Sequence, residues 1–243
     1  MRVLVACEES QAVTIELRRL GHEAYSCDII ECSGGHPEWH IKQDVLKILN
    51  PSYQANFVPT SNGARFRSWY GVRFATCDGN LHEFAGRWDM IIAFPPCTYM
   101  SNAGACRMFP RKGQIDPGRY AKAMEAKAFF MAFYNADCDR ISIENPVPLS
   151  VVGLPEKSQA IQPYEFGHPF TKKTYLWLKG LPNLAPTNVV EPVGPYVCGN
   201  AEIWKKQAEK GRVYGKEKSA KHRSKTFPGI AKAMAEQWAG VCE

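Results

Sequence analysis

The sequence predicts an α/β fold: a mostly parallel β-sheet with helices on both faces, plus a small irregular appendage. Short β-branched apolar runs alternate with helical patterns along the chain. The opening, residues 2–30, reads as strand, helix, strand, which favours a right-handed crossover between two parallel strands. The composition, 45% apolar and 22% charged over 243 residues, is that of one folded globular domain with room for an appendage.

The first elements follow from hydrophobic periodicity. Residues 2–7 form a β-branched run that predicts a buried strand, and residues 23–30 predict a second one. Between them, Ser10 is expected to cap a helix that runs to Leu20. The segment 41–49 predicts a further short element.

The pattern repeats in the second half of the core. Residues 88–94 and 140–143 predict two more strands, and residues 120–136 predict a helix because they contain neither Gly nor Pro. Pro228 is suited to the first turn of a C-terminal helix that is expected to continue to Val241.

Two segments interrupt this alternation. Residues 50–87 are polar and turn-rich, and the Asp78–Gly79 pair is a hairpin signal, so we expect an inserted β excursion. Residues 181–226 are first Pro-rich and then basic. The expected organisation is a core over 1–180, a small variable, basic substrate-recognition segment over 181–226, and a helix over 227–243 that packs back on the core.

Charge and cysteine usage indicate partners and compartment. From Lys205 to Lys225 there are nine Lys or Arg and two Glu, a net charge of +7, in a chain whose total is +6. This favours a polyanionic partner such as nucleic acid or a nucleotide phosphate, the alternative being a solvated surface segment. Nine cysteines without a CxxC pair indicate reduced thiols in the cytoplasm. We expect no leader peptide and no membrane span, since no apolar run approaches the roughly 18 residues required.

Reactive side chains follow two predicted strands. After residues 88–94 come Pro95, Pro96 and Cys97, and the two prolines fix φ and hold the thiol rigidly at the sheet rim. Glu144 and Asn145 follow the strand at 140–143. Ligands of parallel α/β sheets bind beyond the carboxyl ends of the strands, so this edge combines a nucleophile with an acid.

These motifs resemble the DNA cytosine-5 methyltransferases, in particular the small phage and prophage members. That family places Pro-Pro-Cys after a core strand, then Ser four residues beyond the Cys and Ala-Gly at six and seven; here they are Ser101, Ala103 and Gly104. Its second signature is matched by Glu144, Asn145 and Pro146. The resemblance covers roughly residues 1–180, and the last helix more loosely. It implies a Rossmann-like, S-adenosylmethionine-dependent methyltransferase fold.

The resemblance also implies the chemistry. The Cys97 thiolate would add to carbon 6 of cytosine in DNA, which makes carbon 5 nucleophilic, while the Glu144 acid would bond ring nitrogen 3. It places three further residues at the substrate: Pro96, Ser101 and Asn145. Lys172 and Lys173 stand where the family has an Arg-bearing strand motif and are expected to contact substrate as point charges.

S-adenosylmethionine is the implied methyl donor. The residues expected on its side are Glu8, Glu9, Asp28, Asp44 and Pro95. Glu8 and Glu9 replace the family's glycine-rich loop and would meet the ammonium group of the cofactor. Asp28 takes the place of the ribose-binding acid, with Glu31 as a rival, and Asp44 that of the acid near the adenine amine.

Several alternatives stay open. Cys27, Cys32, His36 and His40 have zinc-like spacing, although the adjacent strand and a Gly-Pro loop favour no metal. The short recognition segment fits methylation of free cytidine mononucleotides. The missing loop glycines fit a non-catalytic nucleic-acid-binding relative. Residues 224–229 are expected to replace the family's final motif in preference to Gly199, Asn200 and Ala201, and the sequence leaves the oligomeric state open.

Overall fold

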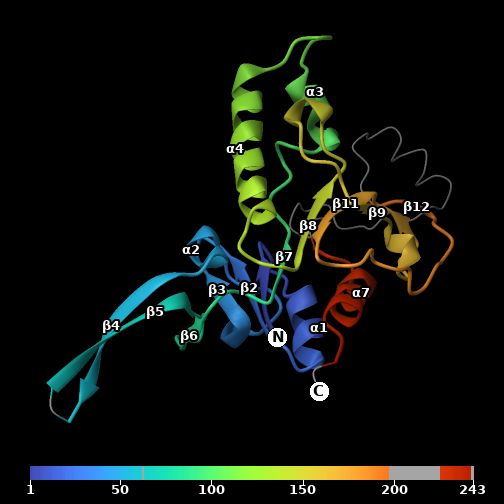
Figure 1. Cartoon of the computed structure of the whole chain (residues 1–243). Coiled ribbons are helices and arrows are strands. Elements are labelled where there is room, and N and C mark those ends of the chain that lie inside the picture. Colours follow the sequence, from blue (N-terminus) through green and yellow to red (C-terminus); the bar gives the residue numbers. More distant parts are fainter. Residues whose placement is uncertain (62, 197–224, 242–243) are drawn as a thin grey trace.

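A computed structural model describes residues 1–61, 63–196 and 225–241. The described residues form a seven-stranded sheet in the order β3-β2-β1-β7-β8-β11-β9 (Figure 1). Strands β3, β2, β1, β7 and β8 are parallel to one another, whereas β11 runs antiparallel to both β8 and β9. The bounds are β1 Arg2–Ala6, β2 Glu23–Asp28, β3 His40–Lys42, β7 Met90–Ala93, β8 Ile141–Pro146, β9 Gln159–Ile161 and β11 Thr174–Lys179. The prediction of an α/β fold with a mostly parallel sheet is confirmed.

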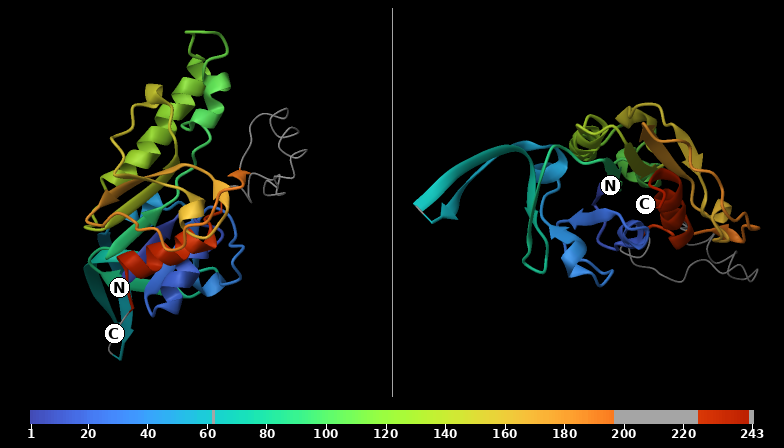
Figure 2. Two further views of the ribbon diagram at one scale, coloured as in Figure 1. Left: turned by 90° about the vertical axis from the view of Figure 1, so that its right-hand side faces the viewer. Right: turned by 60° about the horizontal axis from the view of Figure 1, so that its bottom comes forward.

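Helices cover both faces of this sheet. Helix α4 (Pro117–Tyr134) lies on one face, and α1 (Ala12–Arg19) and α7 (Pro228–Trp238) lie side by side on the other (Figure 2). The short elements are α2 Leu46–Leu49, α3 Ala105–Met108, β10 Phe170–Thr171, β12 Gly194–Pro195 and four 3₁₀ turns at Pro37–Trp39, Asn102–Gly104, Ser150–Val152 and Pro163–Glu165. No helix in the described part of the chain is both long and apolar enough to cross a bilayer.

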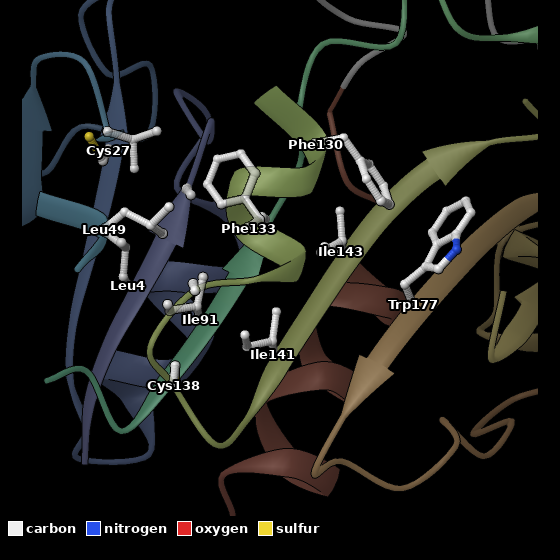
Figure 3. Close-up of a cluster of buried hydrophobic side chains, with 14 of the residues drawn as sticks. Leu4, Cys27, Leu49, Ile91, Phe130, Phe133, Cys138, Ile141, Ile143 and Trp177 are labelled. Carbon is white, nitrogen blue, oxygen red and sulfur yellow. The ribbon is translucent and has the colours of Figure 1, made fainter. Parts of the chain in front are cut away.

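The central strands β1 and β7 are continuous apolar runs, as expected of parallel strands that helices cover on both faces. In β1, Leu4 packs into the core under α4, while its neighbours Val3 and Val5 pack against the α1–α7 layer. Figure 3 shows the first of these cores, in which Phe130 and Phe133 of α4 lie over the sheet. Burial on both faces holds the strand ends, and hence the loops beyond them, in fixed positions.

The start of α1 differs from the prediction. The helix begins at Ala12 after Gln11, which has a left-handed φ of 59°, and Ser10 makes no capping bond. The carboxylate of Glu8 instead accepts from the backbone N–H groups of Val13 (2.7 Å) and Thr14 (3.3 Å). Because Glu8 already satisfies the first free N–H groups of the helix, a serine cap is not needed.

The segment expected to form an inserted β excursion folds as a separate three-stranded sheet that projects from the body as an arm (Figure 1). It consists of β4 (Ser52–Thr60), β5 (Gly63–Ala75) and β6 (Leu81–Ala85), paired antiparallel. The Asp78–Gly79 turn joins β5 to β6, and Gly79 supplies the positive φ of 89° that this turn requires. The base of the arm packs on the core through Val72 and Phe74, whereas four aromatic side chains farther out are exposed: Tyr53, Phe57, Phe66 and Tyr70.

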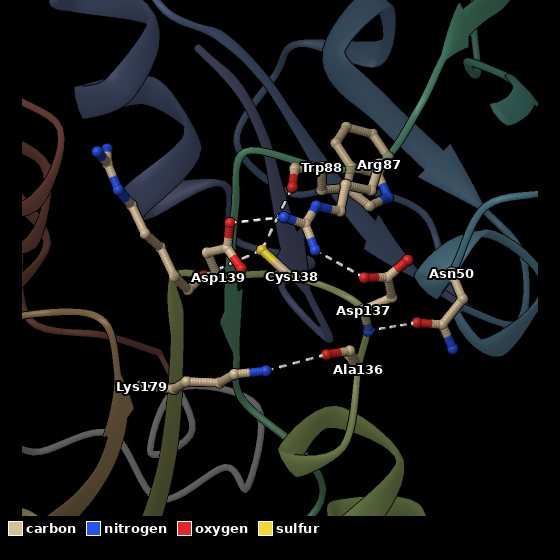
Figure 4. A network of polar contacts seen from close by, with 9 residues as sticks. Asn50, Arg87, Trp88, Ala136, Asp137, Cys138, Asp139 and Lys179 are labelled. Carbon is tan, nitrogen blue, oxygen red and sulfur yellow. Dashed lines mark hydrogen bonds and ion pairs between the residues drawn. The ribbon is translucent and has the colours of Figure 1, made fainter.

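A polar network ties the arm to the amino edge of the sheet (Figure 4). Arg87 bonds Asp137 at 2.8 Å and Asp139 at 2.6 Å, and the Oδ1 of Asn50 accepts from the backbone N–H of Asp137. Lys179 donates to the carbonyl oxygen of Ala136 at 3.4 Å. These polar groups hold together the turns at the amino ends of the strands.

The predicted basic segment lies almost entirely outside the described residues, as do Gly199, Asn200, Ala201 and Ser224. Of the segment 224–229, residues 225–229 are described. They lead directly into α7, where Pro228 occupies the first turn as expected.

Candidate functional site

The strand order reverses direction between β1 and β7. From β1 the chain passes outward through α1 to β2, and from β7 it passes to the other side through α4 to β8. A crevice at such a point is where open α/β sheets bind ligands. The loops after β1, β7 and β8 therefore frame the candidate site. The start of the antiparallel β11 lies at the same edge.

The Cys97 loop is held by its own turn and by the loop after β8. The Cys97 carbonyl accepts from the N–H groups of Met100 (3.0 Å) and Ser101 (2.9 Å). Asn102 donates to the Val147 carbonyl at 2.8 Å, and Leu149 donates back to Met100 at 2.7 Å. The two motif segments are thus joined by backbone hydrogen bonds, which fixes the thiol relative to the end of β8.

Glu144 lies on β8 and faces a pocket on the α7 side. Its neighbours there are Lys172 and Thr174 from the start of β11 and Phe94 from the end of β7. The N-terminal approach to α7 closes the pocket with Lys225, Thr226 and Phe227. The pairing of β8 with β11 explains the grouping, because Leu176 lies opposite Glu144 and Thr174 opposite Pro146.

Glu144 and Lys172 line the same pocket, and the charges of both act on the Cys97 thiol. Burial raises the pKa of the Cys97 thiol, and the negative charge of Glu144 raises it further, whereas Lys172 lowers it. Burial likewise raises the pKa of Glu144, while Lys172 and a hydrogen bond with Thr174 lower it. The expected thiol and acid are brought together, with a cation beside both.

The other residues that were expected to contact substrate differ in their surroundings. Lys172 lines the Glu144 pocket, whereas Lys173 is exposed and lies 5.8 Å from the Tyr175 ring. Ser101 is buried in the Cys97 loop, and Pro96 is exposed at the rim after the buried Pro95.

Asn145 is fully buried, and neither polar atom of its side chain has a hydrogen-bond partner in the described part of the chain. Successive side chains of a strand face opposite sides. Asn145 therefore points to the α4 side and not into the pocket that Glu144 faces.

Glu8, one of the residues expected at the cofactor, holds the start of helix α1. Both carboxylate oxygens bond the first turn of α1, and the Thr14 hydroxyl donates to the second oxygen at 2.8 Å. Burial raises the pKa of Glu8 to about 7 despite these bonds. Its contact with a cofactor ammonium stays a prediction. Next to it, the Glu9 carbonyl accepts from Ser33 at 2.7 Å and so joins this loop to the one after β2.

The loop after β1 turns tightly without glycine. Cys7 and Gln11 both have a left-handed φ of 59°, a conformation that costs a non-glycine residue energy. The buried Gln11 holds the loop by bonding His36 through both side-chain atoms, at 2.8 and 3.1 Å. The loop thus makes its two left-handed turns with residues other than glycine.

Asp28 is the last residue of β2, and Asp44 follows β3, the strand that pairs with β2. Burial, the largest cause, and the charges of Asp28 and Asp44 raise the pKa of the Cys7 thiol, which follows β1. Each uses one oxygen in a local turn, to Ile30 and Leu46 respectively. The rival Glu31 is in an ion pair with Lys42 at 2.6 Å. A cofactor with ribose hydroxyls and an amine fits these acceptors.

The residues with zinc-like spacing make separate contacts, and within the described part of the chain no group of three His, Cys, Asp or Glu side chains could hold a metal. The buried His40 bonds Ser26 and the Ile30 carbonyl through its two ring nitrogens. His36 bonds Glu38, and the Cys27 thiol faces the Gln43 carbonyl. The spacing reflects three separate structural roles.

Arg119 is a site residue that sequence analysis missed. Its Nη2 donates to the Thr98 carbonyl at 2.7 Å, and its guanidinium lies 5.0 Å from the Tyr99 ring. A Cβ at Gly104 would come within 2.6 Å of Nη2. The glycine seven residues after Cys97 therefore leaves the space that the Arg119 side chain occupies. Only the spatial proximity of α4 to the Cys97 loop reveals it.

Comparison with known proteins identifies no family. No family model matches the sequence, and no curated protein matches it. What the chain does is therefore inferred from its residues and their geometry.

Proposed function

We propose that this protein is an S-adenosylmethionine-dependent methyltransferase that methylates carbon 5 of cytosine in DNA through a covalent Cys97 adduct at carbon 6. The observation that carries the proposal is the grouping, at the carboxyl edge of the sheet, of Cys97 in the loop after β7, Glu144 near the end of β8 and Lys172 just before β11. The parallel sheet with helices on both faces supports the Rossmann-like fold that such an enzyme requires.

Cys97 acts as the nucleophile. Its raised pKa makes the thiol the resting form at neutral pH, so the proton must leave before attack. Lys172 favours the thiolate because its positive charge lowers the pKa of Cys97. When Sγ bonds carbon 6, an electron pair moves to carbon 5, which then takes the methyl group. Loss of the carbon 5 proton breaks the Sγ–C6 bond and returns the thiolate.

Glu144 acts as the acid. A carboxyl with a raised pKa retains its proton more readily at neutral pH than an exposed one. It can therefore donate a hydrogen bond to ring nitrogen 3 and stabilise the charge that develops when Cys97 attacks. Thr174 orients the carboxyl from the paired strand β11.

S-adenosylmethionine supplies an electrophilic methyl group when bound. Asp28 and Asp44 would hold its ribose and adenine, and the loop of Glu8 and Glu9 would face its ammonium end. Pro95, buried at the end of β7, would form the wall between cofactor and substrate. We further propose a cytoplasmic location, because the described cysteines are free thiols and suit a reducing compartment.

The decisive test is transfer of labelled methyl groups to duplex DNA and, separately, to cytidine monophosphate. The Cys97→Ser variant is expected to lose transfer entirely while it retains cofactor affinity, because an alcohol is a far weaker nucleophile than a thiolate. Cys106→Ser is the matched control, since Cys106 is exposed on α3 and takes no part in the mechanism. Persistent methylation by Cys97→Ser would eliminate the covalent step.

The same assay separates two other functions. The small size of the 181–226 segment favours free cytidine mononucleotides as substrate, and label in cytidine monophosphate alone would establish that. The structural use of Glu8 in capping α1 favours a non-catalytic relative. Cofactor binding without transfer to either substrate would be its signature.

A further inference from the structure

A second group of cations lies beside the Cys97 loop, away from the Glu144 pocket. Residues 98–124 contain five basic side chains and only one acid, Asp116. We call these cations the α3–α4 corner: Arg107, Arg111, Lys112, Arg119 and Lys122. Figure 1 shows α3 beside α4, at the end of the molecule opposite α1.

Three of these cations, Arg107, Arg119 and Lys122, line an open hollow of about 450 Å³. Tyr99 forms part of its lining, with Arg119 and Lys122 lying 5.0 and 5.5 Å from the ring. Arg107 lines it from α3. The one acid is engaged, because Oδ1 of Asp116 caps α4 by accepting from the Arg119 N–H at 2.7 Å. Within the described residues, none of the five cations forms an ion pair, so the corner retains its positive charge.

The hollow is close to the nucleophile. Phe94 lines the Glu144 pocket and Tyr99 lines the hollow, so the segment that carries Cys97 connects the two. Two residues span at most about 7 Å, which limits the distance between the Cα atoms of Cys97 and Tyr99. That span corresponds to roughly two steps of a DNA strand, whose rise is about 3.4 Å per nucleotide.

We propose that the α3–α4 corner binds the phosphates that flank the target cytosine, and hence that the substrate is a polynucleotide. This inference rests on the proposed function and deepens it. A mononucleotide carries a single phosphate, whereas five cations distributed over α3, the following loop and α4 match a run of phosphates. Lysine and arginine bind such a backbone without regard to base sequence.

The test is binding of a fluorescently labelled DNA duplex to the full chain at several salt concentrations, measured by anisotropy. The double variant Arg107→Gln with Lys122→Gln is expected to bind roughly tenfold more weakly. Its plot of log affinity against log salt should be less steep by about 1 for each cation removed. The control, Lys47→Gln with Lys179→Gln, removes two exposed cations from α2 and β11 and is expected to bind as the wild type does.

A second pair, Arg111→Gln with Lys112→Gln, lies in the exposed loop between α3 and α4 and guards against loss of folding in the first variant. Unchanged affinity and salt slope in both corner variants would overturn the proposal, and so would a wild type that binds no DNA. Binding needs no chemistry. A wild type that binds DNA through the corner and transfers no methyl group would therefore refute the proposed function and leave this inference standing.

Discussion

At the scale of single residues, the burial that would keep Glu144 protonated also lowers the stability of the folded protein at high pH. Burial raises the pKa of Glu144 above the ordinary value of 4.5. The folded state therefore binds a proton more tightly than the unfolded chain does, and stability falls as the pH rises from about 4.5 through the folded pKa. The proton that the proposed mechanism requires on Glu144 is thus retained by an environment that disfavours the ionised acid.

This predicts that Glu144→Gln raises the melting temperature at pH 8 relative to the wild type, because the amide has no charge to bury. The difference should disappear near pH 4, where the wild-type acid is protonated in both states. Thermal unfolding across this range measures it. Equal pH profiles for the two proteins would show that the environment of Glu144 does not raise its pKa.

At the scale of elements, α4 is more than a cover for the sheet. Its first turn supplies Arg119, which reaches past Gly104 to the Thr98 carbonyl beside Cys97. The loop after β8 holds the same segment from the other side through Val147 and Leu149. The thiol is therefore positioned by a helix and a strand end that are separate in the sequence.

Arg119 is accordingly expected to be a positioning residue. Arg119→Lys keeps the charge but loses the planar fork that reaches Thr98, and kcat should fall by up to roughly a hundredfold with little change in KM. The alkylation rate of Cys97 by iodoacetamide should change as well, which a remote structural role would not cause. Glu125→Gln, exposed on the same helix, is the control. Wild-type kcat and alkylation in Arg119→Lys would contradict the role.

At the scale of the whole molecule, the outer part of the β4–β5 arm buries little apolar surface against the rest of the protein. The outer rings of the arm are exposed, Tyr53 by 86% and Phe57 by 71%, whereas Phe74 and Phe84 at its base pack around Trp88. Burial of apolar surface, which stabilises a fold, is therefore concentrated at the base. The outer strands contribute chiefly their own pairing.

Replacement of residues 54–69 by Asn-Gly is thus expected to shift the melting temperature by only a few degrees, because Tyr53 and Tyr70 remain paired across a two-residue turn. Trp88→Ala, at the base, should instead cost about 3–5 kcal/mol of unfolding free energy. Thermal and denaturant unfolding compare the two. Collapse of the shortened protein would mean that the outer arm is integral to the fold.

The sequence was informative where one local pattern decides the outcome. Strand runs that are buried on both faces, the uninterrupted α4, the Asp78–Gly79 turn and Pro228 at the start of α7 each have a local physical cause. The same holds for Cys97 and Glu144, because rigid prolines and a strand end place them at the carboxyl edge whatever else the chain does. Helix α1 was misjudged at its start because its cap comes from Glu8, outside the usual position.

What the sequence alone determined is the alternation of strands and helices and the two reactive groups at neighbouring strand ends. Tertiary structure alone decided which further side chains join them. The antiparallel pairing of β11 with β8 brings Lys172 and Thr174 to Glu144, and the packing of α4 brings Arg119 to Thr98. The histidines with zinc-like spacing bond different partners, His40 with the Ile30 carbonyl and His36 with Glu38. The physical reason is that periodicity acts over a few residues, whereas sheet pairing and packing join residues that are distant in the chain.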